Sequence, residues 1–173
     1  MRYTALHNAM TSIETNGGGY ESAIGLCRTS KNHKIFFVGN GGSAAIASHM
    51  AVDFTKAGGF SALCFNDAAA LTCLANDLGY QNVFSYPLLQ FGAPKDILFA
   101  ISSSGQSMSI INAVTAAKSQ EMSIITLSGF TYDNPLRRLG HINFYVPSDK
   151  YGIVEICHLA ICHSILDQLV ETK

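Results

Sequence analysis

The sequence predicts a single-domain, doubly wound α/β fold, with helices on both faces of a mostly parallel sheet of five strands. Within residues 34–173, short apolar runs that end in small polar residues alternate with helical stretches, which is the pattern of strand–helix–strand units. A chain of 173 residues suits one such domain with a substantial core. In a sheet of this kind, ligands bind beyond the carboxyl ends of the strands.

The expected elements follow one another in a regular order. Residues 1–33 read as an N-terminal helical segment interrupted by glycines at 16–20, and we expect this segment to pack on the main domain or on a neighbouring copy. Helices are predicted at 43–56, 67–76, 107–120 and 153–170. Apolar runs predict the five strands at 34–39, 60–66, 96–105, 122–129 and 142–147.

The composition limits the kinds of partner. Only 13% of the residues are charged and 48% are hydrophobic, whereas a charged share of about 25% is typical. We therefore expect copies of the chain to cover apolar surface in a homo-oligomer. A net charge of −1 gives no electrostatic basis for binding nucleic acid or an anionic membrane.

The cysteines and the N-terminus predict a cytoplasmic protein. The five cysteines are an odd number without a CxxC pair, and most of them lie in apolar runs, so we read them as free thiols in a reducing compartment. The first ten residues lack the apolar core of a signal peptide. No uninterrupted apolar run approaches the roughly 20 residues of a membrane span.

Two predicted strands end in small polar loops, VGNGGS and ISSSGQS, that lead into helices. Glycines let backbone N–H groups approach an anion, the helix N-terminus adds partial positive charge, and serine hydroxyls donate to phosphate oxygens. Neither loop has the spacing GxxxxGK[ST], which excludes a P-loop, and the first is not GxGxxG, which weighs against a dinucleotide site. The candidate binding residues are Asn40, Gly41, Gly42, Ser43, Ser102, Ser103, Ser104 and Ser107.

A purely structural role is the alternative for these loops, because serine and glycine also make N-caps and turns at strand ends. Either loop alone fits that role about equally well. One cap needs only one hydroxyl, however, and three consecutive serines followed by Gly-Gln-Ser exceed that need. Together the two loops favour a site for a monophosphate.

Ionisable side chains lie on two of the predicted helices. His49 and Asp53 stand four apart and share a helix face, where a solvated ion pair is the alternative. Glu155, His158 and His163 lie in an otherwise apolar last helix, where a polar group on a buried face needs a partner. At about 100° per residue the two histidines lie roughly 140° apart, and either can accompany Glu155. Periodicity alone does not choose between them.

Four stretches resemble, in order and spacing, the sugar isomerase (SIS) domain, and they are most similar to its phosphoheptose isomerase branch. They are VGNGGSAAIASHMAVDFT, CLANDLGYQNVFSYPL, AISSSGQSMSIINAV and IITLSG, and the resemblance covers roughly residues 34–170. It implies the SIS fold and a tetramer with shared sites. It also implies an aldose–ketose isomerase that converts sedoheptulose 7-phosphate to glycero-manno-heptose 7-phosphate through an enediol.

The resemblance assigns roles to individual residues. It implies that the two loops hold the sugar phosphate and that Asn40 and Asp77 contact the sugar. Apart from the resemblance, polar residues where strands or helices end are candidates to bind sugar hydroxyls, with turns as the alternative role; they are Asn40, Asn66, Asp67, Asn76 and Asp77. The resemblance favours His163 over His158, with Asp53 as catalytic base and His163 as acid. The four positions that can hold Zn²⁺ are His49, Asp53, Glu155 and His163, and Glu155 is also a candidate substrate contact.

The chain departs from the family pattern in three ways. Asp53 stands where the family has Glu, and Glu155 replaces a neutral Gln. Aligning the last helix also requires a one-residue shift against Tyr151 and Gly152, where the family's Asp has no counterpart. Two alternatives to the heptose enzyme therefore stay open: a non-catalytic phosphosugar-binding or adaptor protein, of the type that associates with a bacterial replication initiator, and an isomerase of another phosphosugar. An adaptor has no need of all four metal-binding positions, so their presence favours an enzyme.

Overall fold

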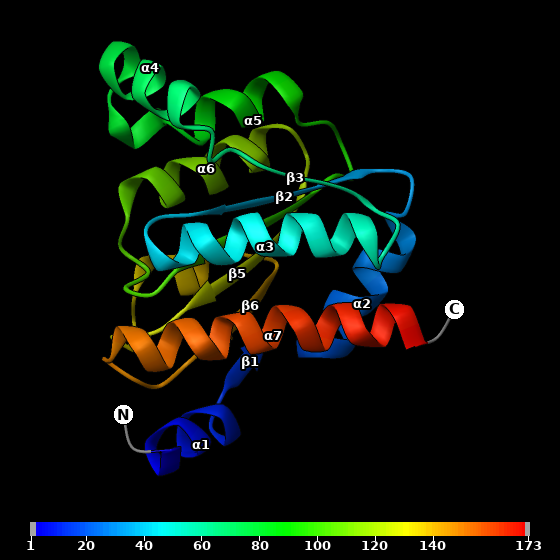
Figure 1. Ribbon diagram of the computed structural model, residues 1–173, viewed down its shortest axis with the longest axis vertical. Coiled ribbons are helices and arrows are strands. Elements are labelled where there is room, and N and C mark those ends of the chain that lie inside the picture. The colour runs from blue at the N-terminus through cyan, green and yellow to red at the C-terminus, as the bar shows by residue number, and fades with distance from the viewer. Residues whose placement is uncertain (1–2, 172–173) are drawn as a thin grey trace.

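The computed structural model describes residues 3–171 and has the predicted α/β architecture, with a mostly parallel sheet between two layers of helices (Figure 1). The sheet has six strands rather than five, in the order β1-β6-β5-β4-β2-β3. β1 pairs antiparallel with β6, and the remaining pairs are parallel. The strands are β1 (Glu14–Asn16), β2 (Lys34–Gly39), β3 (Ser61–Cys64), β4 (Ile97–Ser102), β5 (Ser123–Ser128) and β6 (Ile142–Tyr145).

The helices lie close to where the sequence predicts them, with three additional elements. The final helix α7 begins two residues earlier than predicted, and α5 and two short 3₁₀ turns lie in stretches without a predicted element. The helices are α1 (Tyr3–Thr11), α2 (Gly19–Thr29), α3 (Gly42–Lys56), α4 (Ala68–Leu78), α5 (Ser85–Phe91), α6 (Met108–Ser119) and α7 (Tyr151–Glu171), and the 3₁₀ turns are η1 (Tyr80–Asn82) and η2 (Pro135–Arg138).

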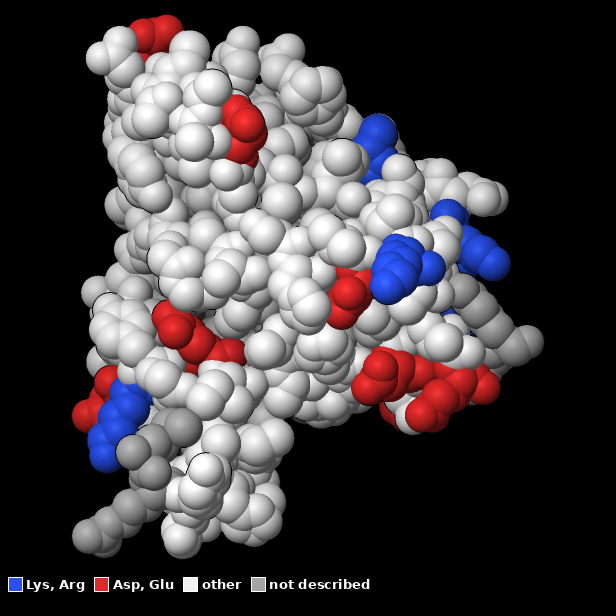
Figure 2. Space-filling view, viewed as in Figure 1, with Lys and Arg blue, Asp and Glu red and all other residues white. Residues whose placement is uncertain are grey.

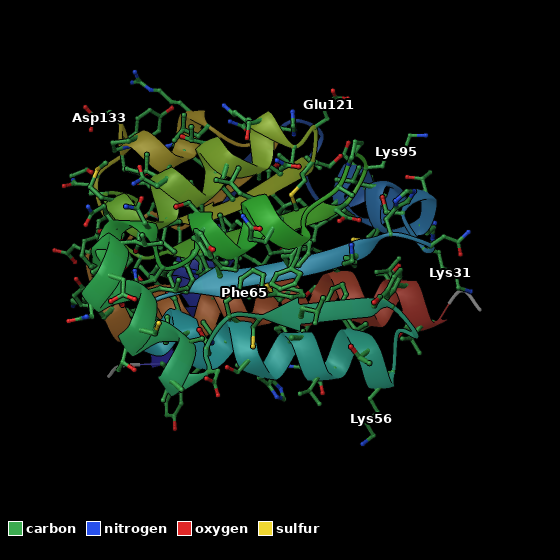
Figure 3. All side chains as sticks on the ribbon, turned by 90° about the horizontal axis from the view of Figure 1, so that it is seen from above. Lys31, Lys56, Phe65, Lys95, Glu121 and Asp133 are labelled. Carbon is green, nitrogen blue, oxygen red and sulfur yellow. The ribbon has the colours of Figure 1, made fainter. Side chains whose placement is uncertain are left out.

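The sheet separates two apolar cores, and the side chains of β2 contribute to both of them. In β2, Ile35 and Phe37 belong to the core under α2, α3 and α7, whereas Phe36 and Val38 belong to the core under α5 and α6. Successive strand side chains point to opposite faces, so a strand covered on both sides is apolar throughout. Phe65, labelled in Figure 3, follows β3 and stacks on Phe36 with a centroid distance of 5.5 Å.

β1 interrupts the segment that the sequence predicts as helical. Its three residues are polar and exposed, so apolar periodicity gives no sign of a strand there. Backbone pairing with β6 holds β1 in place, and Arg137 Nη2 lies 2.7 Å from Glu14 Oε2. The Arg137 guanidinium also stacks on the rings of Tyr132 and Tyr145, at 3.9 and 4.2 Å from their centroids. This cluster attaches the N-terminal segment to the edge of the domain.

α7 is the longest helix of the described chain and lies beside α3, with the two helices running in the same direction (Figure 1). By length and composition α7 could cross a membrane, and half of its most apolar window is buried in the protein. Its buried residues, among them Cys157, Ile161 and Ile165, join the core under the sheet. α7 therefore has the contacts of a core helix.

Candidate active site

The carboxyl ends of β2 and β4 lie side by side, with Gly39 in register with Ile101. From β2 the chain goes to β3 on one side, and it then returns to the other side of β2 to form β4. Such a reversal of strand order leaves a crevice at the strand ends, which is the usual ligand site of a doubly wound sheet. Both predicted loops leave the sheet at this point.

A cavity of about 160 Å³ lies at this reversal of strand order. It is lined by serine hydroxyls and one amide from the two loops, and by residues at the start of α7. Its lining, within the part of the chain that the structure describes, contains neither Lys nor Arg. The lining residues are Asn40, Ser43, Ile101, Ser102, Ser103, Ser104, Ser107, Tyr151 and Glu155. We call this cavity the serine pocket.

The serines of the second loop are arranged as donors towards a ligand. Ser102 Oγ accepts a hydrogen bond from the Gly105 backbone N–H at 3.2 Å, and Ser104 Oγ accepts one from that of Gln106 at 3.3 Å. Each hydroxyl therefore keeps its own hydrogen for another partner. Ser103 Oγ is buried and has no hydrogen-bond partner among the described residues. Buried hydroxyls normally have a hydrogen-bond partner, so the Ser103 hydroxyl is suited to donate a hydrogen bond to a ligand oxygen.

Two helix N-termini add to the serine pocket. α3 begins at Gly42 directly after the first loop, and α6 begins at Met108 directly after the second. Their unpaired backbone N–H groups carry partial positive charge, which favours an anion. Because no cationic side chain lines the pocket, hydroxyls and helix ends are the groups available to neutralise a phosphate there.

Asn40 is held in the first loop by residues from two other parts of the fold. Its Oδ1 accepts a hydrogen bond from the Tyr80 hydroxyl at 2.8 Å, and its Nδ2 lies 2.9 Å from both Ser107 Oγ and Ser109 Oγ. Reasoning from the sequence names Asn40 and Ser107 but misses Tyr80 and Ser109. Tyr80 lies forty residues from Asn40, and local patterns carry no information about such a contact.

Glu155 lies in the serine pocket beside the start of α3. A Cβ atom at Gly42 would overlap the Glu155 carboxylate, so the absence of a side chain at Gly42 makes room for it. Glu155 therefore contributes a carboxylate to the wall of the pocket. Glu155 thus lies in the serine pocket and is not grouped with His49, Asp53 and His163. Its roles as a substrate contact and as a metal ligand stay predictions.

Three of the four predicted metal-binding residues come together where α3 and α7 lie side by side. His49, Asp53 and His163 each offer one ligand atom, and these atoms lie within 4.8 Å of one another. His49 Nε2 lies 3.2 Å from Asp53 Oδ2, and the ring centroids of His49 and His163 are 5.3 Å apart. Glu155 is not a member of this cluster. Two imidazoles and one carboxylate are a donor set that zinc commonly uses, so the residues fit such an ion.

The serine pocket and the metal-binding cluster lie at different levels of the same pair of helices. Gly42 faces Glu155 at the first level, and His49 faces His163 at the second. Seven residues separate the two levels on α3 and eight on α7, which corresponds to about 10 to 12 Å along the helix axes. A molecule that reaches both groups must therefore be extended.

His158 lies away from this arrangement. It is fully buried, and its Nε2 lies 3.2 Å from the Ser128 carbonyl oxygen. Because a carbonyl can only accept, Nε2 carries the proton, and Nδ1 has no partner among the described residues. Burial lowers the pKa of His158 to about 4, although the bond to Ser128 acts in the opposite direction. His158 is a neutral core histidine.

Among the Asn and Asp residues predicted to contact the sugar, Asn40 lines the serine pocket, and Asn66, Asp67, Asn76 and Asp77 do not. Asn76 and Asp77 are exposed at the end of α4, where Asn76 Nδ2 donates to Asp77 Oδ1 at 2.8 Å. Asp67 caps α4 by accepting from the Ala70 N–H, and Asn66 Nδ2 donates to the Ala44 carbonyl. Short polar side chains favour such caps and turns. Within this single chain, Asn76 and Asp77 therefore do not line the serine pocket, and their contact with a sugar stays a prediction.

Comparison with known proteins identifies the family. The sequence profile described as the SIS domain matches residues 4–129. The chain is 38% identical over 159 residues to the phosphoheptose isomerase of Glaesserella parasuis, which covers 87% of this chain and 81% of that protein. It is 36% identical over 149 residues to the phosphoheptose isomerase of Helicobacter pylori, with 82% and 77% covered.

Solved structures give the same result. The phosphoheptose isomerase of Neisseria gonorrhoeae superposes with a TM-score of 0.81 at 28% identity, covering 96% of this chain and 94% of that one. That of Francisella tularensis superposes with a TM-score of 0.83 at 25% identity, covering 99% and 95%. This chain therefore belongs to the SIS domain family, in its phosphoheptose isomerase branch.

Proposed function

We propose that this protein is an aldose–ketose isomerase that interconverts sedoheptulose 7-phosphate and glycero-manno-heptose 7-phosphate. The observation that carries the proposal is the spacing of two groups along α3 and α7. The serine pocket offers neutral donors to a phosphate, and His49, Asp53 and His163 offer acid, base and metal-ligand groups one level further along. The 31–38% identity to phosphoheptose isomerases supports the same reaction.

The spacing supports a long substrate. An extended chain advances about 1.2 Å per bond, as the reach of a peptide backbone shows. The seven bonds from phosphorus to C2 of a seven-carbon 7-phosphate therefore span about 8 Å, and those of a triose phosphate span about 4 Å. Side chains of either group extend a few ångströms from their helices. A seven-carbon chain thus connects levels that are about 10 to 12 Å apart with little help from side-chain reach, whereas a three-carbon chain covers less than half of that distance.

The proposed chemistry is proton transfer between C1 and C2. Asp53 takes a proton from C1 of the ketose while His163 gives a proton to the carbonyl oxygen at C2, which produces a cis-enediol. Asp53 then returns its proton to C2, and the hydroxyl at C1 gives its proton to His163, so that C1 becomes the aldehyde. Both residues must lie within about 3 Å of the atoms that they serve. Binding of the phosphate in the serine pocket holds the reacting carbons in place.

A zinc ion is part of the proposal, with His49, Asp53 and His163 as the residues that hold it. When bound there, Zn²⁺ supplies Lewis-acid polarisation of the carbonyl oxygen. An imidazole and a carboxylate each have a second donor atom, so binding the ion leaves one atom of Asp53 and one of His163 for proton transfer. Glu155, which lies in the serine pocket, accepts hydrogen bonds from sugar hydroxyls next to the phosphate in this proposal.

We also propose that the protein is a cytoplasmic homotetramer. Each chain in it consists of an SIS domain, residues 34–173, and an N-terminal helical segment, residues 1–33. In Figure 2 the middle of the surface over α3 and α7 is uncharged, with charged groups towards the helix ends, and Val52 and Ile156 are exposed on these helices. Exposed apolar patches mark interfaces. α4 has no buried residue although it is rich in Ala and Leu. A neighbouring copy that covers α4 would bring Asn76 and Asp77 to an interface. The five free cysteines support a reducing compartment.

The test measures activity and metal content on the same protein. The purified protein is treated with a chelator, reloaded with Zn²⁺ and incubated with sedoheptulose 7-phosphate while the aldose is detected. We expect turnover to return with zinc, and mass spectrometry of the metal to show that His49→Ala removes the ion. Metal retained in full by His49→Ala would reject the proposed ligands, and binding of the phosphosugar without turnover under any condition would favour the adaptor alternative.

A further inference from the structure

We infer that Tyr80 is a positioning residue for phosphate binding, because its hydroxyl fixes the Asn40 amide so that Ser107 can donate its proton to the phosphate. The inference rests on the proposed function, since it concerns how the serine pocket holds its ligand. Tyr80 itself is not among the residues that line the pocket. Its effect is transmitted through hydrogen bonds.

The network connects three separate parts of the chain. Tyr80 belongs to η1, Asn40 follows β2, and Ser107 and Ser109 lie at the start of α6. The Tyr80 hydroxyl donates to Asn40 Oδ1 at 2.8 Å, and Asn40 Nδ2 donates to Ser107 Oγ and Ser109 Oγ, each at 2.9 Å. Every polar atom of the Asn40 side chain therefore has a partner in the network.

The positions of the hydrogens follow from this arrangement. An amide nitrogen has two hydrogens, and here they point to the two serine oxygens. Ser107 Oγ therefore acts as an acceptor towards Asn40 and keeps its own hydrogen free. Ser109 is buried, and its Oγ lies 3.4 Å from Ser107 Oγ, so its hydrogen can also be directed to Ser107. Ser107, which lines the pocket, is left as a donor to an anion.

The reversed orientation of the Asn40 amide would have the opposite effect. Oδ1 would then face the two serines and accept their hydrogens, which would remove Ser107 as a donor to the phosphate. Tyr80 opposes this reversal because in the observed orientation its hydroxyl donates to the amide oxygen while both amide hydrogens have serine acceptors. After reversal the hydroxyl could accept one amide hydrogen, and the other would have no partner in the network. Without the hydroxyl, neither orientation has a partner on that side, and the amide is free to accept from the serines.

Tyr80 is well placed for a test, because its side chain is 54% exposed and removing one oxygen leaves the core unchanged. We expect Tyr80→Phe to raise the Kd for sedoheptulose 7-phosphate, measured by isothermal titration calorimetry, by about tenfold, since hydrogen bonds to charged groups are the stronger ones. KM should rise with little change in kcat. Tyr86→Phe, another half-exposed tyrosine, is the matched control and should bind as the wild type does.

A double-mutant cycle distinguishes positioning from a general structural effect. In a Ser107→Ala background the proton that Tyr80 directs is absent, so adding Tyr80→Phe should change the Kd less than twofold. An unchanged Kd for Tyr80→Phe alone would overturn the inference, and so would an equal loss in both backgrounds. If the wild-type protein binds no phosphosugar, the proposed function fails and the inference fails with it. Binding by the wild type together with either of the first two results rejects the inference alone.

Discussion

Gly42 and Glu155 meet where α3 and α7 begin, so closely that a Cβ atom at Gly42 would overlap the Glu155 carboxylate. The contact links the first loop to the last helix. The contact lies beside the serine pocket. His49 and His163 meet further along the same two helices, seven residues after Gly42 on α3 and eight after Glu155 on α7. A glycine that reads as part of a phosphate loop thus has a second role, because it admits a carboxylate into the pocket.

This contact predicts the effect of a minimal substitution. Gly42→Ala must displace Glu155 or shift α3, so we expect the Kd for sedoheptulose 7-phosphate to rise at least tenfold. Gly25→Ala is the control, because a Cβ at this helical glycine meets nothing within 4 Å and the change should stabilise the protein by about 0.5 to 1 kcal/mol. Calorimetric binding and thermal unfolding of both variants check the expectation, and normal binding by Gly42→Ala would reject the close contact.

The serine loop gives a second prediction. Ser103→Ala combined with Ser104→Ala removes a buried hydroxyl that has no partner among residues 3–171 and a neighbour that also lines the pocket. Phosphosugar affinity should fall at least tenfold, or about 1.4 kcal/mol. Ser61→Ala, at the start of β3 and at the other end of the sheet, should leave the affinity as it is. Equal affinity of the double variant and the wild type would show that the phosphate binds elsewhere.

The two histidines of α7 should separate in their effects on turnover. His163 lies beside His49 and Asp53, whereas His158 is buried against Ser128. His163→Ala should therefore abolish isomerisation, and His158→Gln should keep most of it. Steady-state rates with the wild type as reference make the comparison. Loss of activity in His158→Gln with activity retained in His163→Ala would contradict this assignment and place the reaction on the face of α7 that carries His158.

His158 also predicts a pH dependence of stability. Its pKa is about 4 in the folded protein and about 6.5 in an unfolded chain. Between these values the unfolded state binds a proton that the folded state does not, so the free energy of unfolding is fully retained above pH 6.5 and falls as the pH drops towards 4.

Urea unfolding at pH 7 and pH 5 measures this contribution. We expect the wild type to lose about 1 to 2 kcal/mol more than His158→Gln between the two pH values. Gln keeps a donor for the Ser128 carbonyl but does not titrate, so the difference isolates the imidazole. Equal losses in the two proteins would show that His158 titrates normally in the fold.

Much of the fold is predictable from the sequence because its central strands are buried on both faces. Their apolar runs end at glycines and serines, and β2 begins and ends at the predicted residues. β1 is not predictable in this way, because it is a strand of three exposed polar residues that depends on pairing with β6. α5 has Pro87 in its first turn and aromatic residues around it, a composition that does not indicate a helix.

The candidate site is predictable to the extent that it is local. The two loops and the pair His49 and Asp53 depend on short spacings, and these residues lie where the strands and α3 place them. The contact of Tyr80 with Asn40 depends on the path of the chain through α4. Glu155 lies apart from the metal-binding cluster because of how α7 packs against α3. Neither relationship can be read from spacing within one helix.

The most direct measurement of the central claim is NMR of the wild-type protein in D₂O with sedoheptulose 7-phosphate and a small panel of other phosphoketoses, with and without Zn²⁺. Proton transfer through an enediol exchanges the hydrogen on the carbon next to the carbonyl. We predict that deuterium appears at that carbon with the seven-carbon substrate and that Zn²⁺ accelerates the exchange. Binding of these sugars without exchange at any of them would contradict the proposed isomerase and identify a phosphosugar-binding protein.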